Sequence, residues 1–418
     1  MCLTIRLAGQ YSLDSLTSES SSEVASISTG CRISTSSWPV TRVSHKFLAV
    51  LHGQDVHVVA LALSCEFLYA GSNKGDIRAW DHPNMQEAPK FGCSEAAVKC
   101  LIVVGSKIIS AHQDHKIRVW RRSKSNPKEH KLLTTLPSMK DYITNFLPPK
   151  NYVKVRRHHK TLWINHHDCI TSLVVGNGVL YSGSWDKSVK VWRLEDFKCL
   201  ESLNVHIDAV NALAVDTRND LLYSGSGDTT IKLFHKQESE GKQCQHVLIA
   251  TLEAKSPVNA LALSPDVSVL YSGQSDKAVT VWKMHVGETR QWTAVGTLLG
   301  HRMSVLCLST LTNIVISGSA DKTIRVWKRN NNGHHSCVSV MVGHTGPVKS
   351  LCAMPDAEWG VLVYSGSLDG DIRVWWVPED DSDSLSSDET NALDSPLVVN
   401  WRASTPNARD LPRPTVPR

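Results

Sequence analysis

Three groups of residues in this chain have a spacing that could support acid–base chemistry. In each group a His precedes an Asp by 20 to 25 residues, and a Trp follows that Asp by six. The groups are His166/Asp186/Trp192, His301/Asp321/Trp327 and His344/Asp369/Trp375. A His oriented by a carboxylate is a common general base. Because the same spacing recurs along one chain, we interpret these residues as parts of a repeated structural network and not as a catalytic site.

Each of these Trp residues ends a longer phrase that occurs seven times. The phrase contains an apolar run, a Ser-Gly-Ser-like turn entry, a turn Asp and an aromatic residue six positions later. The seven endings are Trp80, Trp120, Trp192, Phe234, Trp282, Trp327 and Trp375. A period of roughly 40 to 45 residues is that of a four-stranded propeller blade. The pattern therefore predicts an all-β, seven-bladed propeller, and it resembles the WD-repeat (WD40) family.

The resemblance implies that the His, the turn Asp, a Ser of the preceding strand and the closing Trp form a buried hydrogen-bonded network. Each copy opens with Val or Ile followed three residues later by Leu or Val. The openings are Val56/Val59, Val98/Leu101, Ile170/Leu173, Val210/Leu213, Val258/Leu261, Val305/Leu308 and Val348/Leu351. The copies outside the three groups depart from the pattern: the first has His52 but Lys74 in place of Asp, the second has Ser94 and the fifth Ala254 in place of His, and the fourth ends in Phe234.

The composition places few constraints on function beyond a large core. Of 418 residues, 41% are hydrophobic and 20% are charged, and the formal net charge is +5. Eleven Cys residues without a C-x-x-C pair indicate reduced thiols, and we expect a cytoplasmic and nuclear protein with no membrane segment. The chain lacks G-x-S-x-G, H-E-x-x-H and P-loop motifs. We therefore expect no catalytic residues, no cofactor and no metal.

The repeats divide the chain into a ring and two arms. Residues 1–42 are rich in Ser and Thr and are predicted to be disordered, and residues 378–418, first acidic and then Pro-rich, are predicted to be a disordered tail. The propeller is assigned to residues 43–377. The segment Phe47–Leu51 is predicted to form the outermost strand of the seventh blade, so that neither chain end leaves an open sheet edge.

A basic insert at residues 121–160 separates the second and third copies. It contains eleven Lys or Arg residues against two acidic residues. Leu132–Leu136 is expected to supply the fourth strand of blade two, which leaves a free loop from Pro137 to Lys160. The insert is either a solvated loop or a docking surface. In the second interpretation Arg156, Arg157 and Lys160 contact the partner, with Tyr142, Phe146 and Tyr152 as apolar anchors.

Direct nucleic-acid binding is not expected, because no recognition motif accompanies the charge and the isoelectric point is only about 8.6. The insert contains Asn126-Pro-Lys-Glu-His-Lys131, Leu136-Pro-Ser-Met-Lys-Asp141 and Pro149-Lys-Asn-Tyr-Val-Lys-Val-Arg-Arg-His-His159, and it leads into Leu162-Trp-Ile-Asn-His-His-Asp168. With these segments the chain resembles plant WD-repeat proteins of the JINGUBANG type. The resemblance implies a non-enzymatic repressor of pollen germination and tube growth that binds proteins, including transcription factors, in cytoplasm and nucleus. We expect the ring to be monomeric.

The alternative function is a substrate receptor of a cullin ubiquitin ligase. Receptors of that kind usually carry Trp-Asp-x-Arg after the third strand of a blade. In this chain only Trp80-Asp81 has the literal dipeptide, and His82-Pro83 follows it, without the Arg.

Overall fold

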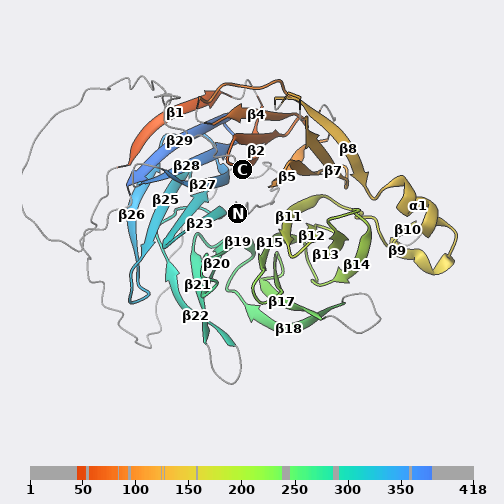
Figure 1. Ribbon diagram of the computed structural model, residues 1–418. Coiled ribbons are helices and arrows are strands. Elements are labelled where there is room, and N and C mark those ends of the chain that lie inside the picture. The colour runs from red at the N-terminus through yellow and green to blue at the C-terminus, as the bar shows by residue number, and fades with distance from the viewer. Residues whose placement is uncertain are drawn as a thin grey trace, which may run out of the picture. The chain divides into compact units, whose positions relative to one another are not determined.

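The computed structural model describes residues 45–52, 56–82, 84–92, 96–123, 125–126, 128–156, 159–237, 245–285, 291–356 and 360–378. Within these residues the fold is a seven-bladed β-propeller, as predicted (Figure 1). The strands of the ring run from Lys46 to Pro378. The predictions of disorder for residues 1–42 and for nearly all of the tail concern residues outside the described part of the chain.

Blade three shows the common order of strands. From the inner to the outer edge it contains β11 (Ile170–Gly176), β12 (Val179–Ser184), β13 (Ser188–Arg193) and β14 (Cys199–Asn204), all antiparallel. Every side chain of β12 is buried, because this strand lies between two strands of its own sheet and between two neighbouring blades.

Four other blades have the same order. The strands are β5 (Val98–Val104), β6 (Lys107–His112), β7 (Ile117–Arg122) and β8 (His130–Leu136) in blade two; β15 (Val210–Asp216), β16 (Leu221–Ser226), β17 (Thr230–Gln237) and β18 (Gln245–Glu253) in blade four; β19 (Val258–Leu263), β20 (Val269–Gln274), β21 (Val279–His285) and β22 (Gln291–Leu298) in blade five; and β23 (Val305–Leu311), β24 (Ile314–Ser319), β25 (Thr323–Arg329) and β26 (His335–Val342) in blade six.

Blade one differs at its outer edge. Its sheet contains β2 (Val58–Leu63), β3 (Phe67–Ser72) and β4 (Ile77–Asp81). Beyond β4, two isolated bridges, Ile77 with Phe91 and Trp80 with Glu87, take the place of a fourth strand. The segment that covers this edge is therefore irregular, and it still forms backbone hydrogen bonds with Ile77, Ala79 and Asp81 of β4.

Blade seven closes the ring with strands from both ends of the propeller. It contains β27 (Val348–Asp356), β28 (Gly360–Ser367) and β29 (Asp371–Pro378), and β1 (Lys46–His52) pairs antiparallel with β29 as the outermost strand. This confirms the prediction made for Phe47–Leu51. On the inner side β2 contacts both β5 and β27, so the circle of inner strands is continuous.

The Gly of the Ser-Gly-Ser phrase is required by the packing of neighbouring blades. A Cβ atom on Gly183 would lie 2.8 Å from Cγ1 of Val210, the first residue of the next inner strand. At the seam of the ring, a Cβ atom on Gly366 would lie 2.6 Å from Cγ1 of Val58. These distances are too short for a side chain, and they explain why a strand interior carries Gly at this point.

The register of blade one corrects the sequence assignment. Val58 pairs with Ser72 as Ile170 pairs with Ser184, so blade one opens at Val58 and not at Val56. The position four residues before Val58 is Gln54, which lies outside the described residues. His52 therefore does not hold the network position. It ends β1, where its Nδ1 atom lies 2.9 Å from a carboxylate oxygen of Asp371.

The insert is folded, which corrects the expectation of a free loop. The fourth strand of blade two is β8, which includes the predicted Leu132–Leu136. After it come α1 (Met139–Phe146), the 3-10 turn η1 (Pro149–Asn151), and a hairpin of β9 (Tyr152–Arg156) and β10 (His159–Leu162). Figure 1 shows these elements outside the ring of blades, beside β8 and β14.

Candidate functional site

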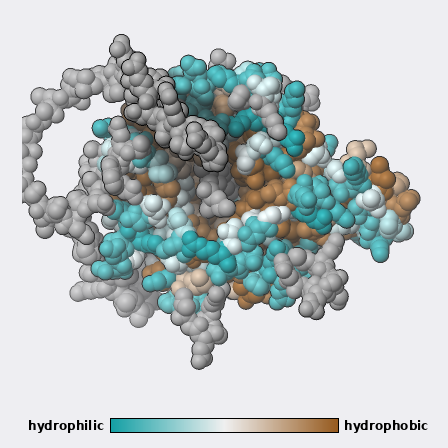
Figure 2. Space-filling model, in the orientation of Figure 1, coloured by the Kyte–Doolittle hydropathy of each residue, from teal (hydrophilic) through white to brown (hydrophobic). Residues whose placement is uncertain are grey.

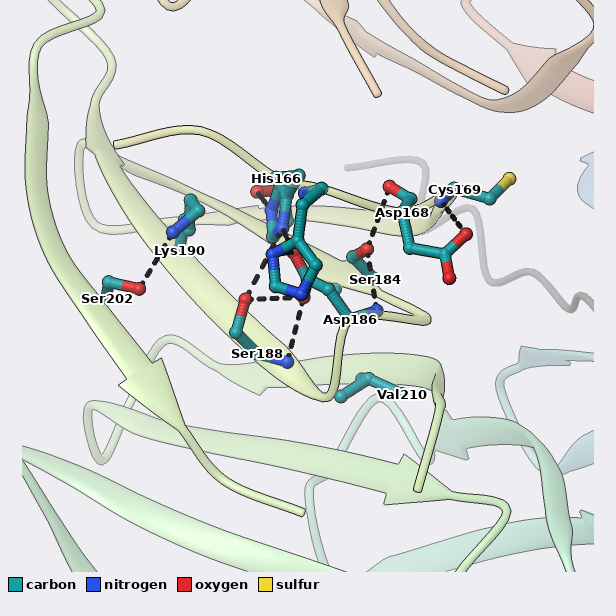
Figure 3. Close-up of polar contacts among 12 residues, drawn as sticks. His166, Asp168, Cys169, Ser184, Asp186, Ser188, Lys190, Ser202 and Val210 are labelled. Carbon is teal, nitrogen blue, oxygen red and sulfur yellow. Dashed lines mark hydrogen bonds and ion pairs between the residues drawn. The ribbon is translucent and has the colours of Figure 1, made fainter. Parts of the chain in front are cut away.

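The predicted network of blade three is assembled from β12, β13, the turn between them and the segment that precedes β11. The carboxylate of Asp186 accepts a hydrogen bond from Nδ1 of His166 at 2.7 Å. Since the neutral imidazole then has its acceptor at Nε2, the Ser182 hydroxyl donates to that atom at 2.8 Å. The Ser182 oxygen in turn accepts from Nε1 of Trp192 at 2.9 Å. Figure 3 shows His166 over the turn that carries Asp186 and Ser188.

Solvent is excluded from the reactive atoms of this network. The side chains of His166 and Asp186 are 1% and 0% exposed. Burial lowers the pKa of His166, so the ring is held neutral. Burial alone would raise the pKa of Asp186, but the interactions with His166 and with the Ser188 hydroxyl lower it well below the ordinary value of a carboxyl group. A substrate cannot reach a pair that is enclosed in this way.

The same geometry recurs in blades four, six and seven. The distances from His Nδ1 to the Asp carboxylate are 2.9 Å for His206/Asp228, 3.0 Å for His301/Asp321 and 2.8 Å for His344/Asp369. The closing indoles of Trp327 and Trp375 donate to Ser317 and Ser365 at 2.9 and 3.0 Å. The pair in blade four was missed from the sequence because that copy ends in Phe234. Its signal was the position of His206, four residues before Val210.

In blades two and five, which lack the His before the inner strand, a polar residue of the second strand takes its place. Where blade three has Ser184, blade two has His112, whose Nε2 atom lies 2.8 Å from the Ser110 hydroxyl. At the same position blade five has Gln274, whose amide donates to the hydroxyls of Ser272 and Thr280 at 3.2 and 3.0 Å. A polar group thus reaches the buried Ser hydroxyl in both blades, although Ser94 and Ala254 replace the usual His.

A family model described as "WD domain, G-beta repeat" matches residues 157–193, 197–235, 243–283, 292–328 and 335–375. These five segments cover the region in which the structure places blades three to seven, and each includes the aromatic residue that ends its copy. The chain is a WD-repeat protein.

Other WD-repeat proteins are similar to part of this chain. An F-box/WD-40 repeat-containing protein of Arabidopsis thaliana is 27% identical over 166 residues, which are 39% of this chain and 26% of the relative. Protein ROOT INITIATION DEFECTIVE 3, also of Arabidopsis thaliana, is 28% identical over 38% of this chain and 33% of its own length. WD repeat-containing protein pop2 of Schizosaccharomyces pombe is 26% identical over 38% of this chain and 23% of its own length. The chain thus spans about a quarter to a third of the length of these relatives.

The insert is the second candidate site of this WD-repeat protein, and it contains the six predicted partner-binding residues. Tyr142 and Tyr152 are half-buried and pack against the core of blades two and three. Phe146 is 63% exposed, and Lys160 is exposed on β10. The side chain of Arg156 and all of Arg157 lie outside the described residues. The structure therefore gives the two Tyr residues a role in attaching the insert, and it leaves Phe146 facing solvent.

Polar contacts hold the inner face of α1 to the ring. Ser138 and Asp141 form a reciprocal capping box at the start of the helix. The side-chain oxygen of Asn145 accepts from Nε1 of Trp163 at 3.2 Å. The backbone carbonyl of Trp163 accepts from Nζ of the buried Lys190 in blade three at 2.6 Å. The insert is thus connected by hydrogen bonds to the blade that follows it.

The outer face of α1 is apolar and exposed. Met139, Ile143, Phe146 and, just after the helix, Leu147 are 75%, 70%, 63% and 82% exposed. Positions i, i+4, i+7 and i+8 lie on one side of a helix. Figure 2 shows brown, apolar atoms at the right-hand end, where Figure 1 places α1. Of the three predicted apolar anchors only Phe146 belongs to this stripe, although the spacing is visible once the capping box marks the start of the helix.

Within the described residues, no three His, Cys, Asp or Glu side chains are placed to hold a metal ion. No helix in that part of the chain is long and apolar enough to cross a membrane.

Proposed function

We propose that this WD-repeat protein is a non-enzymatic scaffold that binds other proteins, and that the insert is one of its docking surfaces. The observation that carries the proposal is the outward apolar stripe of α1. Exposed apolar surface costs about 25 cal/mol per Å² relative to burial, and a partner that covers the stripe recovers this free energy. The polar inner face and apolar outer face of α1 are the reverse of an ordinary surface helix. The buried His/Asp pairs support the absence of catalysis, because their reactive atoms are enclosed.

The test compares the full chain with a variant in which residues 138–160 are replaced by a short Gly/Ser linker. Both proteins are fused to a proximity-labelling enzyme and expressed in the same cells. We expect a subset of labelled proteins to disappear with the insert while the temperature of thermal unfolding changes little, since blades two and three keep their strands. An identical set of labelled proteins would refute the role of the insert.

The resemblance to the JINGUBANG type supports a more specific role, as a plant repressor of pollen germination and tube growth. In this proposal the protein acts as a monomeric ring in the cytoplasm and nucleus, and transcription factors are among its partners. Two of the similar proteins described above are from a plant. Loss of the gene should increase the fraction of pollen grains that germinate, and a copy without residues 138–160 should fail to reverse that increase. Normal germination in the mutant would exclude this role.

A substrate receptor of a cullin ubiquitin ligase is the second candidate, and one motif favours it. Trp80-Asp81 carries the literal dipeptide, and an F-box protein is among the similar sequences. In the structure a carboxylate oxygen of Asp81 accepts from the backbone N–H of Gln86 at 2.8 Å, so this side chain serves a local turn. Recovery of a cullin adaptor in a pull-down with the full chain would favour the ligase over a plain scaffold.

A further inference from the structure

A groove lies beside α1. It is bounded by the outer part of blade two and by the turn that joins β13 to β14 in blade three. Its volume is about 800 Å³. It is lined by parts of β7 and β8, by the start of α1, and by the turn Glu195–Phe197 between β13 and β14. The groove is therefore formed jointly by the ring and the insert.

The charge of this groove is predominantly positive. Five cationic side chains line it, Lys107, Lys116, Arg118, Arg121 and Lys140, against the carboxylates of Glu195 and Asp196.

Neighbouring groups already engage part of this charge. Arg118 forms an ion pair with Asp114 at 2.6 Å, and Asp196 pairs with Arg193 at 3.3 Å. In contrast, Lys116, Arg121 and Lys140 are exposed and form no ion pair with any carboxylate that the structure describes. These three cations are available to an acidic ligand.

The groove is continuous with the apolar stripe of α1. Met139 lines the groove and is also the first residue of the stripe, and Lys140 lies next to it on the same helix. Leu133 of β8 also lines the groove, is 43% exposed and adds apolar surface. A ligand that binds here therefore meets apolar side chains and three exposed cations on one continuous surface.

We infer that this surface binds an acidic amphipathic helix of a partner protein. This inference rests on the proposed function of the insert as a protein-docking site. The apolar side of such a helix packs on Leu133, Met139 and Ile143, and its carboxylates face Lys116, Arg121 and Lys140. The stripe extends over about two helical turns, which matches the i, i+3/i+4, i+7 anchors of a helix bound in a groove. A phosphate backbone would match the cations but would leave the apolar stripe uncovered.

The probe is a synthetic 20-residue peptide with a fluorescein label. Leu occupies one helical face at i, i+3, i+4 and i+7, and Glu fills most of the other positions. A second peptide has the same composition in an order that removes the apolar face, and a third replaces every Glu by Lys. Binding to the full chain is followed by fluorescence anisotropy. We expect the first peptide to bind about tenfold or more tightly than either of the others, because apolar anchors and charge are both needed.

Two pairs of variants identify the surface. Met139→Ser with Ile143→Ser should weaken binding by about tenfold, mainly through faster dissociation, because these residues provide the apolar anchors. Arg121→Glu with Lys140→Glu should slow association and reduce its salt dependence, because charges steer the encounter. The matched controls are Ile249→Ser, at an exposed apolar residue of β18, and Lys255→Glu, at an exposed cation after β18. Neither control should change binding.

Several results would overturn the inference. Equal binding of the first and second peptides would show that only charge is recognised, and no binding by the full chain would remove the site altogether. Tighter binding of a 20-nucleotide single-stranded oligonucleotide, with a steep log–log salt dependence of roughly −0.7 per neutralised phosphate, would assign the surface to nucleic acid.

If the peptide fails while proximity labelling still depends on residues 138–160, the proposed function stands and the acidic-helix inference falls. If the peptide binds while labelling is independent of the insert, the proposed role of the insert as a docking surface in the cell falls.

Discussion

At the scale of single residues, the ring places a polar group against a buried Ser hydroxyl in several ways. Blades three, four, six and seven use the His of the segment before the inner strand, while blades two and five use His112 and Gln274 from the second strand. An unpaired hydroxyl in the core would cost free energy. The satisfied hydrogen bond is therefore retained even where the residue that usually provides it is lost.

Asp186 provides a direct test of the network. Its carboxylate accepts from His166 and from the backbone N–H groups of His167 and Ser188. Asp186→Ala should lower the free energy of unfolding by on the order of 1 to 3 kcal/mol, because buried donors lose their acceptor. Lys74→Ala, at the equivalent and exposed position of blade one, should have a far smaller effect. Urea unfolding of both variants measures the difference.

A different outcome for Asp186→Ala would contradict the structural role of the network. If Asp186→Ala lost a partner or an activity while its unfolding free energy stayed unchanged, the network would be a functional site and not part of the scaffold.

The residues of the network could be predicted only where the complete phrase is present. Val56/Val59 and Val58/Leu61 both have the i, i+3 spacing, so spacing alone could not choose the frame of blade one. Strand pairing chooses it, because Val58 lies opposite Ser72. That His112 takes over the contact with Ser110 could not be predicted from the sequence either. The contact arises because the second strand lies close in space to the position that the missing His would occupy.

At the scale of strands, Tyr–His hydrogen bonds connect neighbouring blades. The Tyr lies on the second strand of one blade, and the His lies at or beyond the outer strands of the next. The pairs are Tyr69–His130 at 3.2 Å, Tyr181–His246 at 3.0 Å, Tyr271–His335 at 2.8 Å and Tyr364–His82 at 2.8 Å. In a fifth junction Tyr223 meets the ring of Trp292 edge to face. The blades are thus joined near the rim as well as along their inner strands.

These pairs predict that acid destabilises the ring. Burial, together with Arg122 and Arg329, lowers the pKa of His130 and of His335 to about 4. The folded chain therefore takes up these protons less readily than the unfolded chain, in which a His titrates near 6.5. Their contribution to stability is complete above about pH 6.5 and is lost as the pH falls toward 4.

The measurement is urea unfolding as a function of pH. His335→Gln should reduce the slope of unfolding free energy against pH between 6.5 and 4.5, since one such His no longer titrates. The reduction should correspond to at most one proton in the difference between the protons bound by the unfolded and the folded chain. Asn331→Gln, at an exposed and non-titrating residue of the preceding turn, is the control and should leave the slope unchanged. Equal slopes for the unaltered chain and the His335 variant would contradict the explanation.

Within the insert, one strand was predicted from the sequence and the helix was not. Its length and charge indicated a loop, and the strand at its start was identified correctly. The helix was not anticipated, although Ser138-x-x-Asp141 is a recognisable helix start. Its apolar residues then face outward, so the usual assumption that an apolar stripe marks the core would have placed Ile143 on the wrong side.

At the scale of the whole molecule, the pairing of β1 with β29 predicts an abrupt effect of N-terminal truncation. Deletion of residues 1–40 leaves β1 intact and should leave thermal unfolding nearly unchanged. Deletion of residues 1–51 removes the strand, including the buried Leu51 and the edge-to-face contact of Phe47 with Trp375. It also exposes the edge of β29. The second variant should unfold at a lower temperature or without a cooperative transition. Equal melting curves would show that the ring does not depend on this closure.

Strand β1 also imposes an order on biosynthesis. Translation produces this strand before any other part of the ring, yet its partner is among the last to leave the ribosome: His52 and Asp371 are 319 residues apart in the sequence. Until then β1 has no sheet to join, and the closing contact carries the entropy of a very long loop. A polypeptide released before Asp371, by a nonsense codon or a stalled ribosome, lacks β29 and presents an unpaired strand to chaperones and proteases. The closed ring is therefore a mark of completed translation through blade seven.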